Sequence, residues 1–81
     1  MNNKVGTMKL FVANFDDSTT LVDLAMLFLE FGNVVAIRMK EGERRKYALI
    51  EMDSFGAERA IADLDRKDWR GMRLEVTESR W

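Results

Sequence analysis

The sequence predicts an α+β fold in which a four-stranded antiparallel sheet carries two helices on one face. Three observations lead to this prediction. Four segments of the 81-residue chain alternate apolar and polar residues with the period of two that is typical of half-buried strands. Two other segments repeat apolar residues with a helical period and begin with capping residues. The resulting order, strand, helix, strand, strand, helix, strand, is that of a ferredoxin-like βαββαβ sandwich.

The composition is that of a single soluble domain. Apolar residues make up 47% and charged residues 33% of the chain, which argues against disorder. The longest apolar run, residues 24–29, is far shorter than the roughly 20 residues of a membrane span, and residues 1–7 lack a signal-peptide pattern. We therefore expect a cytoplasmic protein that does not enter the membrane.

The residue types that support most catalytic and metal sites are missing from the chain. It contains no histidine and no cysteine, which are the usual acid–base groups and metal ligands. The sequence therefore predicts a protein that is not an enzyme and that holds no metal and no cofactor.

The first strand is expected over residues 9–15, after a flexible leader of residues 1–7. Two of its apolar side chains are expected to face the core, Leu10 and Val12. The intervening positions face the other side of the sheet because successive side chains alternate along a strand; they are Lys9, Phe11 and Ala13.

A helix is expected over residues 21–31. Thr20 and Asp23 have the spacing of a capping box, in which each side chain bonds the backbone of the other residue. Gly32 is expected to end the helix in the left-handed conformation. One apolar stripe of this helix is assigned to the core: Leu24, Leu27, Phe28 and Phe31.

The same helix carries a second apolar stripe opposite the first, formed by Val22, Met26 and Leu29. Scattered apolar residues on a surface are common and need no explanation. Three of them at helical spacing also form a continuous patch, which is typical of a face that binds a protein partner or a second copy of the chain. Both interpretations stay open.

The second and third strands are expected to form a hairpin around residues 41–44. In residues 33–40, one face carries Val35, Ile37 and Met39 and the other carries Ala36, Arg38 and Lys40. In residues 45–52, Tyr47, Leu49 and Glu51 share a face with Arg45, whereas Ala48, Ile50 and Met52 face the core.

The second helix is expected to begin at Asp53-Ser54 and to end within residues 65–68, with four small or aliphatic residues inward: Ala57, Ala60, Ile61 and Leu64. Trp69 is interpreted as a structural cover for the end of this helix. The last strand is expected over residues 72–79, with two residues inward, Leu74 and Val76, and three outward, Arg73, Glu75 and Thr77.

In this topology the outward residues of the four strands share one uncovered face, on which Phe11 and Tyr47 lie on adjacent central strands. Five of the 13 cations and two of the 14 acids fall there, so the face carries about +3 although the whole chain carries −1. Exposed aromatic rings beside cations are typical of a platform for nucleotides. The alternative is a cross-strand ring pair that only stabilises the sheet, or that a tail covers.

At these positions the chain resembles the RNA recognition motif family. Residues 10–15 (LFVANF) resemble its hexamer motif and residues 45–52 (RKYALIEM) its octamer motif. The resemblance covers residues 8–79, which we take as the domain, and is to the small single-domain bacterial members; residues 80–81 form a short C-terminal tail.

The resemblance implies that Phe11 and Tyr47 stack two successive bases of single-stranded RNA and that Arg45 pairs with the phosphate between them. It implies that four other cations follow the RNA backbone: Lys9, Arg38, Lys40 and Arg73. Two positions depart from the family pattern, since Leu49 stands where an aromatic residue is usual and Lys46 where glycine is usual. We expect weak sequence preference, and single-stranded DNA as a second ligand.

Two other functions are compatible with the same fold. One is a protein-interaction module that acts through Val22, Met26 and Leu29. The other is a small hydrolase similar to acylphosphatases, which would need an anion-binding loop where residues 14–17 are acidic instead. Trp81 is expected either to stack on the sheet or to cap the edge of the core.

Overall fold

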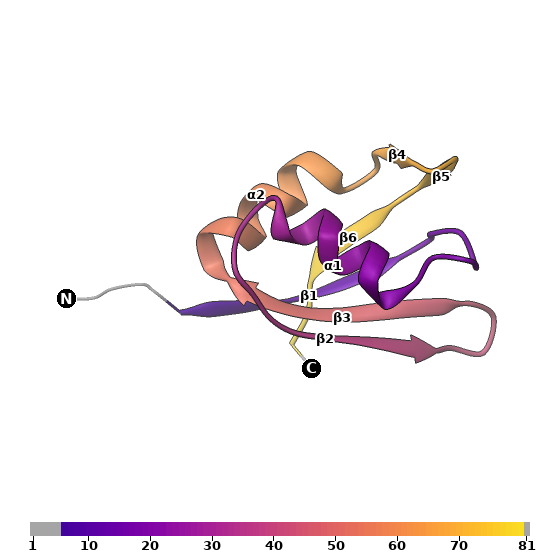
Figure 1. The fold of residues 1–81 in the computed structure, drawn as a ribbon, viewed down its shortest axis with the longest axis horizontal. Coiled ribbons are helices and arrows are strands. Elements are labelled where there is room, and N and C mark those ends of the chain that lie inside the picture. Colours follow the sequence, from indigo (N-terminus) through magenta and orange to yellow (C-terminus); the bar gives the residue numbers. More distant parts are fainter. Residues whose placement is uncertain (1–5, 81) are drawn as a thin grey trace.

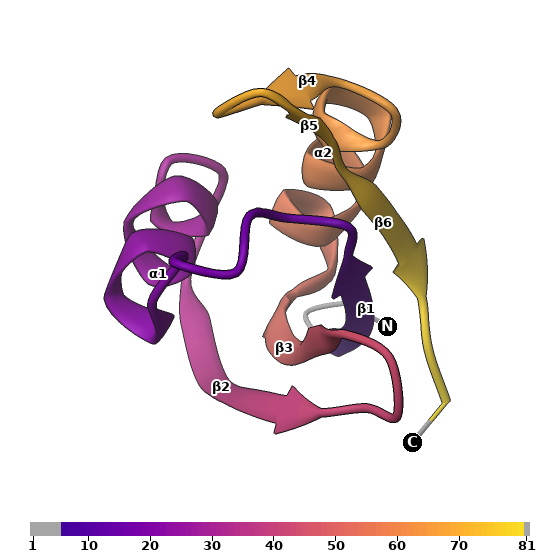
Figure 2. The same ribbon diagram turned by 90° about the vertical axis from the view of Figure 1, so that its right-hand side faces the viewer.

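The computed structural model describes residues 6–80, which form two layers (Figure 1). β1 (Thr7–Ala13), β2 (Val34–Glu41), β3 (Lys46–Asp53) and β6 (Glu75–Glu78) form an antiparallel sheet in the order β2-β3-β1-β6. α1 (Leu21–Leu29) and α2 (Ser54–Leu64) both lie on one face of this sheet (Figure 2). The predicted βαββαβ architecture is confirmed.

The strand order follows from two interleaved crossovers. β1-α1-β2 and β3-α2-β6 each join strands that have one other strand between them, so β1 and β3 become the two central strands. α1 packs against β2, and α2 against β1, β3 and β6. Among the described residues, neither helix is both long enough and apolar enough to span a membrane.

The core lies between the sheet and the helices and is built mainly from the residues that strand alternation and helical period assigned to it. Phe15 is the exception: alternation over residues 9–15 would place it on the side of Phe11, but β1 ends at Ala13 and Phe15 is buried in the core. β1 and β3 contribute buried side chains at every second position, and α1 buries Leu24 and Phe28. The other fully or nearly buried apolar residues of this core cluster are Leu10, Val12, Phe15, Ala48, Ile50, Met52, Ala57, Ala60, Leu64, Leu74 and Val76. Ala13, which was expected to face outward, is also fully buried but lies outside the cluster. Ile61 is half-buried and packs against this cluster.

β1 begins and ends two residues earlier than the sequence pattern predicted. Thr7 already pairs with Asp53 of β3, so it belongs to the strand, whereas the leader was expected to run to residue 7. The strand ends at Ala13 because Asn14 has a φ of 63°, a left-handed conformation that asparagine tolerates better than most residues. Residues 1–5 lie outside the part of the chain that the structure describes.

The start of α1 is as predicted. Thr20 Oγ1 accepts a hydrogen bond from Asp23 N at 3.1 Å, and Asp23 Oδ2 accepts one from Thr20 N at 2.9 Å, which completes the capping box. The hydrogen bond from Thr20 N lowers the pKa of the Asp23 carboxyl below its ordinary value.

The end of α1 differs from the prediction. The helix ends at Leu29, two residues before Phe31, and Gly32 does not have a positive φ. Gly32 is instead pressed against the start of α2, since a Cβ atom there would overlap Asp53 Oδ1 and lie 3.1 Å from Gly56 Cα. Glycine is therefore required for close approach and not for a left-handed turn.

β2 contains a bulge that the alternation pattern did not predict. Val34 pairs with Met52 and Ala36 with Glu51, so Val35 is an extra residue without a partner on β3. Val35 is 61% exposed, and Val34 packs against the core in the place expected for Val35. From Ala36 onward the alternation holds, which keeps Arg38 and Lys40 on the face opposite the helices.

The expected last strand is divided in two. Met72–Arg73 forms β5, which pairs with β4 (Asp68–Trp69) in a separate hairpin, and only Glu75–Glu78 joins the main sheet as β6. The hairpin turns at Arg70 and Gly71, whose φ angles are 55° and 86°, as in a type I′ turn. The buried Leu74 separates the two strands, and its N–H donates to Lys67 O at 2.9 Å.

We expect Gly32→Ala to lower the free energy of unfolding by about 1–3 kcal/mol, the usual cost of overpacking a tight contact. Gly6→Ala is the matched control, because no atom lies within 4 Å of a Cβ atom placed at Gly6. Urea unfolding measures both. Equal stability of the two variants would contradict the close contact of Gly32 with Asp53.

Asp53 gives a prediction for the dependence of stability on pH. Its Oδ2 accepts a hydrogen bond from Gly56 N at 2.9 Å and its Oδ1 accepts one from Asn33 N at 2.8 Å, and these bonds lower the pKa of the carboxyl. A carboxyl with a lowered folded-state pKa stabilises the fold above its unfolded-state pKa, and this contribution is lost as the pH falls through the folded-state value.

Asp53→Asn places an amide N–H₂ against one of the two N–H donors, so we expect lower stability than wild type at pH 7. The difference should shrink as the pH falls below about 4, the ordinary aspartate pKa. Thermal unfolding between pH 7 and pH 3 measures this, with Asp63→Asn, which changes an exposed acid within α2, as the control. A difference that stays constant over this range would refute the role of the charge.

Candidate nucleic-acid interface

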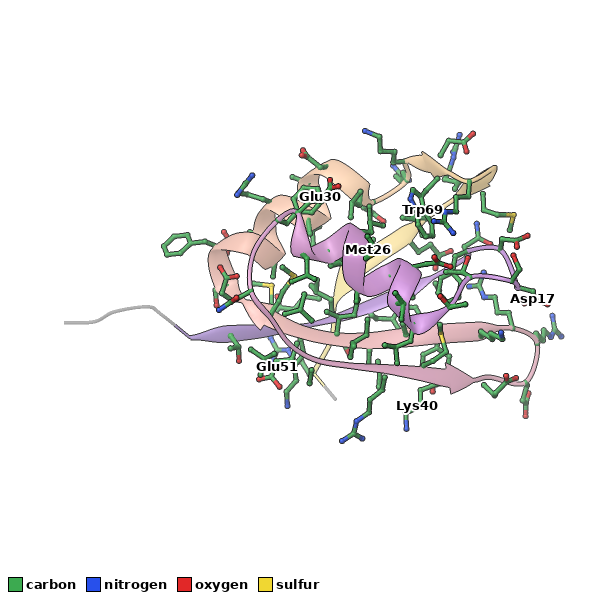
Figure 3. All side chains as sticks on the ribbon, in the orientation of Figure 1. Asp17, Met26, Glu30, Lys40, Glu51 and Trp69 are labelled. Atoms are coloured by element: carbon green, nitrogen blue, oxygen red, sulfur yellow. The ribbon has the colours of Figure 1, made fainter. Side chains whose placement is uncertain are left out.

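The sheet face opposite the helices is here called the open face, because no helix within residues 6–80 lies on it (Figure 2). Lys40 and Glu51 point away from the helices on this side (Figure 3). Residues that pair across antiparallel strands point to the same face, so the register arranges the open face in three rows. Each row is given in the order β2, β3, β1, β6. The first row is Lys40, Tyr47, Ala13 and Glu75, and the second is Arg38, Leu49, Phe11 and Thr77. The third row is Ala36, Glu51 and Lys9, and β6 contributes no residue to it.

Phe11 and Tyr47 are diagonal neighbours on the two central strands. Phe11 pairs directly with Leu49 and Tyr47 with Ala13, and the two ring centroids are 5.4 Å apart with the ring planes tilted by 31°. Both residues are half-buried. The expected proximity of the two rings on the face opposite the helices is confirmed, and the geometry is that of an offset aromatic pair that is partly accessible to solvent within the described residues.

Cations flank the ring pair. Lys40 lies beside Tyr47 in the first row, Arg38 beside Leu49 in the second, and Lys9 lies one row from Phe11. The side chain of Lys46 does not point to the open face. Its Nζ donates a hydrogen bond to Asp17 O at 2.9 Å and so connects β3 to the β1–α1 loop.

Arg45 lies in the β2–β3 loop, one residue before β3, and not within the strand as the octamer pattern implied. Its guanidinium reaches across the end of β1. Nη1 donates to Asn14 Oδ1 at 3.1 Å, and Nη2 lies 3.5 Å from Glu75 Oε1 on β6. The side chains of Arg45 and Glu75 are 49% and 50% exposed, so this group remains accessible to solvent.

Arg73 is not part of the three rows, because the last strand is divided and Arg73 belongs to β5. Its carbonyl oxygen accepts a hydrogen bond from Asn14 Nδ2 at 2.6 Å. The open face of the described chain therefore holds four cations, Lys9, Arg38, Lys40 and Arg45, and two acids, Glu51 and Glu75. Its net charge is about +2, lower than the +3 expected from the sequence.

Asn14 is a member of this site that the sequence analysis did not identify. Its side chain bonds both Arg45 and the backbone of Arg73, and so joins the β2–β3 loop, β1 and β5. The only local signal was an asparagine at the end of a strand, where such residues often adopt positive φ. The partners of Asn14 are 31 and 59 residues away, which no local pattern indicates.

The apolar stripe of α1 faces solvent as expected, with Val22 62%, Met26 65% and Leu29 55% exposed. Next to it, α1 and the β4–β5 hairpin enclose a shallow groove lined by Asp23, Met26, Leu27, Glu30, Trp69 and Arg70, of which Met26, Glu30 and Trp69 are labelled in Figure 3. Trp69 packs against the core, as predicted. Arg70 lies 4.6 Å from the Trp69 ring and 3.2 Å from Asp23 Oδ2.

Within residues 6–80, no three acidic side chains are grouped as a metal site would require. Trp81, which the sequence predicts either to stack on the sheet or to cap the edge of the core, lies outside the described residues.

Comparison with known proteins points to one family. A family model described as "RNA recognition motif" matches residues 10–75. The chain is 30% identical to RbpD, described as a candidate RNA-binding protein of the cyanobacterium Nostoc sp., over 78 residues that cover 90% of this chain and 83% of that protein.

Solved structures have the same fold. A crystal structure of the RNA-binding protein PG1 superposes with a TM-score of 0.79 at 28% identity, over 89% of this chain and 93% of that one. A structure of the Rna15 RNA recognition motif with bound RNA (GU) gives a TM-score of 0.77 at 20% identity, over 88% of this chain and 81% of that one; at this identity the similarity shows the fold.

Proposed function

Because the chain belongs to the RNA recognition motif family, we propose that it is a non-catalytic module that binds single-stranded RNA on its open face. The observation that carries this proposal is the Phe11–Tyr47 ring pair, with centroids 5.4 Å apart on a face without helices and flanked by cations. The family match spans both rings and Arg45. Its relative RbpD is itself described as a candidate RNA-binding protein.

Each ring of the pair presents a flat apolar surface to one base, so that two successive bases stack on Phe11 and Tyr47. A base–aromatic stack contributes about 1–3 kcal/mol, and two stacks therefore contribute about 2–6 kcal/mol before the cost of ordering the RNA. Micromolar affinity requires about 8 kcal/mol. The remainder comes from phosphate contacts, and we expect affinity in the micromolar range or weaker.

The cations of the open face bind the RNA backbone. Arg45 meets the phosphate between the two stacked bases, and Lys9, Arg38 and Lys40 lie on either side of the rings. Leu49, between Arg38 and Phe11 in its row, offers apolar contact but no ring on which a base can stack. Stacking and phosphate contacts distinguish poorly between the four bases, so we expect RNA binding with weak sequence preference.

Single-stranded DNA presents the same two chemical groups, base faces and phosphates. We therefore expect it to bind at the same rings as RNA. The α1 stripe of Val22, Met26 and Leu29 is exposed, but the family match and the ring pair favour the open face. A protein-interaction function for this stripe stays a prediction from the sequence.

We expect Tyr47→Ala to weaken binding of a short mixed-sequence RNA by more than about 1 kcal/mol, or about fivefold, because one base loses its stacking surface. Phe55→Ala is the matched control: it removes a ring that is 70% exposed on α2, away from the open face. Fluorescence anisotropy measures affinity, and thermal unfolding confirms that both variants fold. Equal affinities for the two variants would refute the stacking role of Tyr47.

Raising the salt concentration should weaken RNA binding with a log–log slope of about −2 to −3, if three or four phosphates are neutralised at roughly 0.7 per phosphate of a single strand. Arg38→Gln should make the slope shallower by about 0.7, whereas Lys67→Gln, an exposed cation beyond α2, should leave it unchanged. A wild-type slope near zero would show that the cations of the open face do not bind phosphate.

A further inference from the structure

We propose that Glu75 competes with the RNA backbone for Arg45 and so limits the affinity of the open face. The inference rests on the proposed function, because it describes how the same RNA-binding site is tuned. Glu75 was identified in the sequence only as an outward residue of the last strand, and the proposed RNA contacts do not use it.

The competition follows from the contacts of Arg45 in the free protein. Its guanidinium has two partners, the neutral Asn14 Oδ1 at 3.1 Å and the charged Glu75 Oε1 at 3.5 Å. About half of each charged side chain remains exposed. A phosphate can therefore approach the guanidinium, but it meets a cation whose charge is already balanced by a carboxylate.

Glu75 also lies in the row of the ring on which a base is proposed to stack. Both Tyr47 and Glu75 pair with Ala13, from opposite sides of β1. A backbone phosphate placed near Tyr47 and Arg45 would therefore lie close to a second negative charge. When the phosphate displaces Glu75 from Arg45, the freed carboxylate stays on the same face and repels it.

Glu75 is not needed to aim Arg45, because Asn14 already does so. Asn14 is itself anchored by the hydrogen bond from its Nδ2 to Arg73 O at 2.6 Å, and its amide oxygen directs the guanidinium without cancelling the charge. The interaction free energy of an exposed ion pair is small and changes an equilibrium constant by a factor of about 1.4 to 5. A phosphate can thus displace Glu75, and the displacement lowers the affinity by a factor within this range.

The test compares Glu75→Gln with Glu78→Gln, which removes the same charge from the same strand. Glu78 pairs with the core-facing Leu10 and lies three residues, or about 10 Å, along β6 from Glu75, a distance at which about 0.1 M salt screens charges. At that salt concentration we expect Glu75→Gln to bind a mixed-sequence RNA about two- to fivefold more tightly than wild type. Glu78→Gln should change the affinity by less than about 1.5-fold.

A double-mutant cycle then separates competition from a general effect of charge. In an Arg45→Gln background the carboxylate has no guanidinium to occupy and only its direct repulsion of the phosphate remains, so Glu75→Gln should tighten binding by a smaller factor than it does in the wild-type background. All variants are expected to fold, because an exposed ion pair contributes little to stability. Thermal unfolding of each variant checks this.

Three results would refute the proposed competition. The first is weaker RNA binding by Glu75→Gln than by wild type, which would make Glu75 a positioning residue. The others are a gain in affinity from Glu75→Gln that is as large in the Arg45→Gln background as in wild type, or an equally large gain from Glu78→Gln. Each of these is informative only where Tyr47→Ala weakens RNA binding as expected. If Tyr47→Ala has no effect, the proposed function fails, and the competition fails with it.

Discussion

A sheet that carries both helices on one side leaves its other side in water, and the pleat of β1 and β3 decides which residues stand there. Leu10 and Val12 pair with Ile50 and Ala48 in the core. Because side chains alternate, Phe11 between Leu10 and Val12 faces outward, and so do Leu49 and Tyr47 on either side of Ala48, which makes Phe11 and Tyr47 diagonal neighbours. A slip of one residue would bury the rings and expose the core, so the core itself holds the open face in register.

The distribution of charge over this sheet matters more than the net charge of the chain. The chain carries −1 in total, but the open face carries about +2 and the rest of the chain therefore about −3. Screening in solution confines electrostatic effects to about 10 Å, so an approaching anion responds to the nearest face. The Arg45–Glu75 ion pair, 3.5 Å long, reduces the positive charge next to the rings. Its effect on an approaching anion therefore matters more than its contribution to the stability of the fold.

The sequence by itself determined the elements and their faces, because both depend on neighbours a few residues apart. The period-two pattern identified β1 and β3, and the capping box fixed the start of α1 at Thr20 and Asp23. The order of the elements then fixed the sheet order, since crossovers have one hand. Together these local rules are enough to predict that Phe11 and Tyr47 are neighbours on the sheet.

Only the tertiary structure decided how the ends and rims of these elements meet. Gly32 is needed because Asp53 and Gly56 approach it, Val35 is displaced by a bulge that matches β2 to β3, and Arg73 leaves the sheet because β5 pairs with β4. Asn14 and Arg45 meet across 31 positions of the chain. Periodicity and capping report on a residue and its near neighbours, whereas these contacts join segments that only the packed fold brings together, so the sequence alone could not specify them.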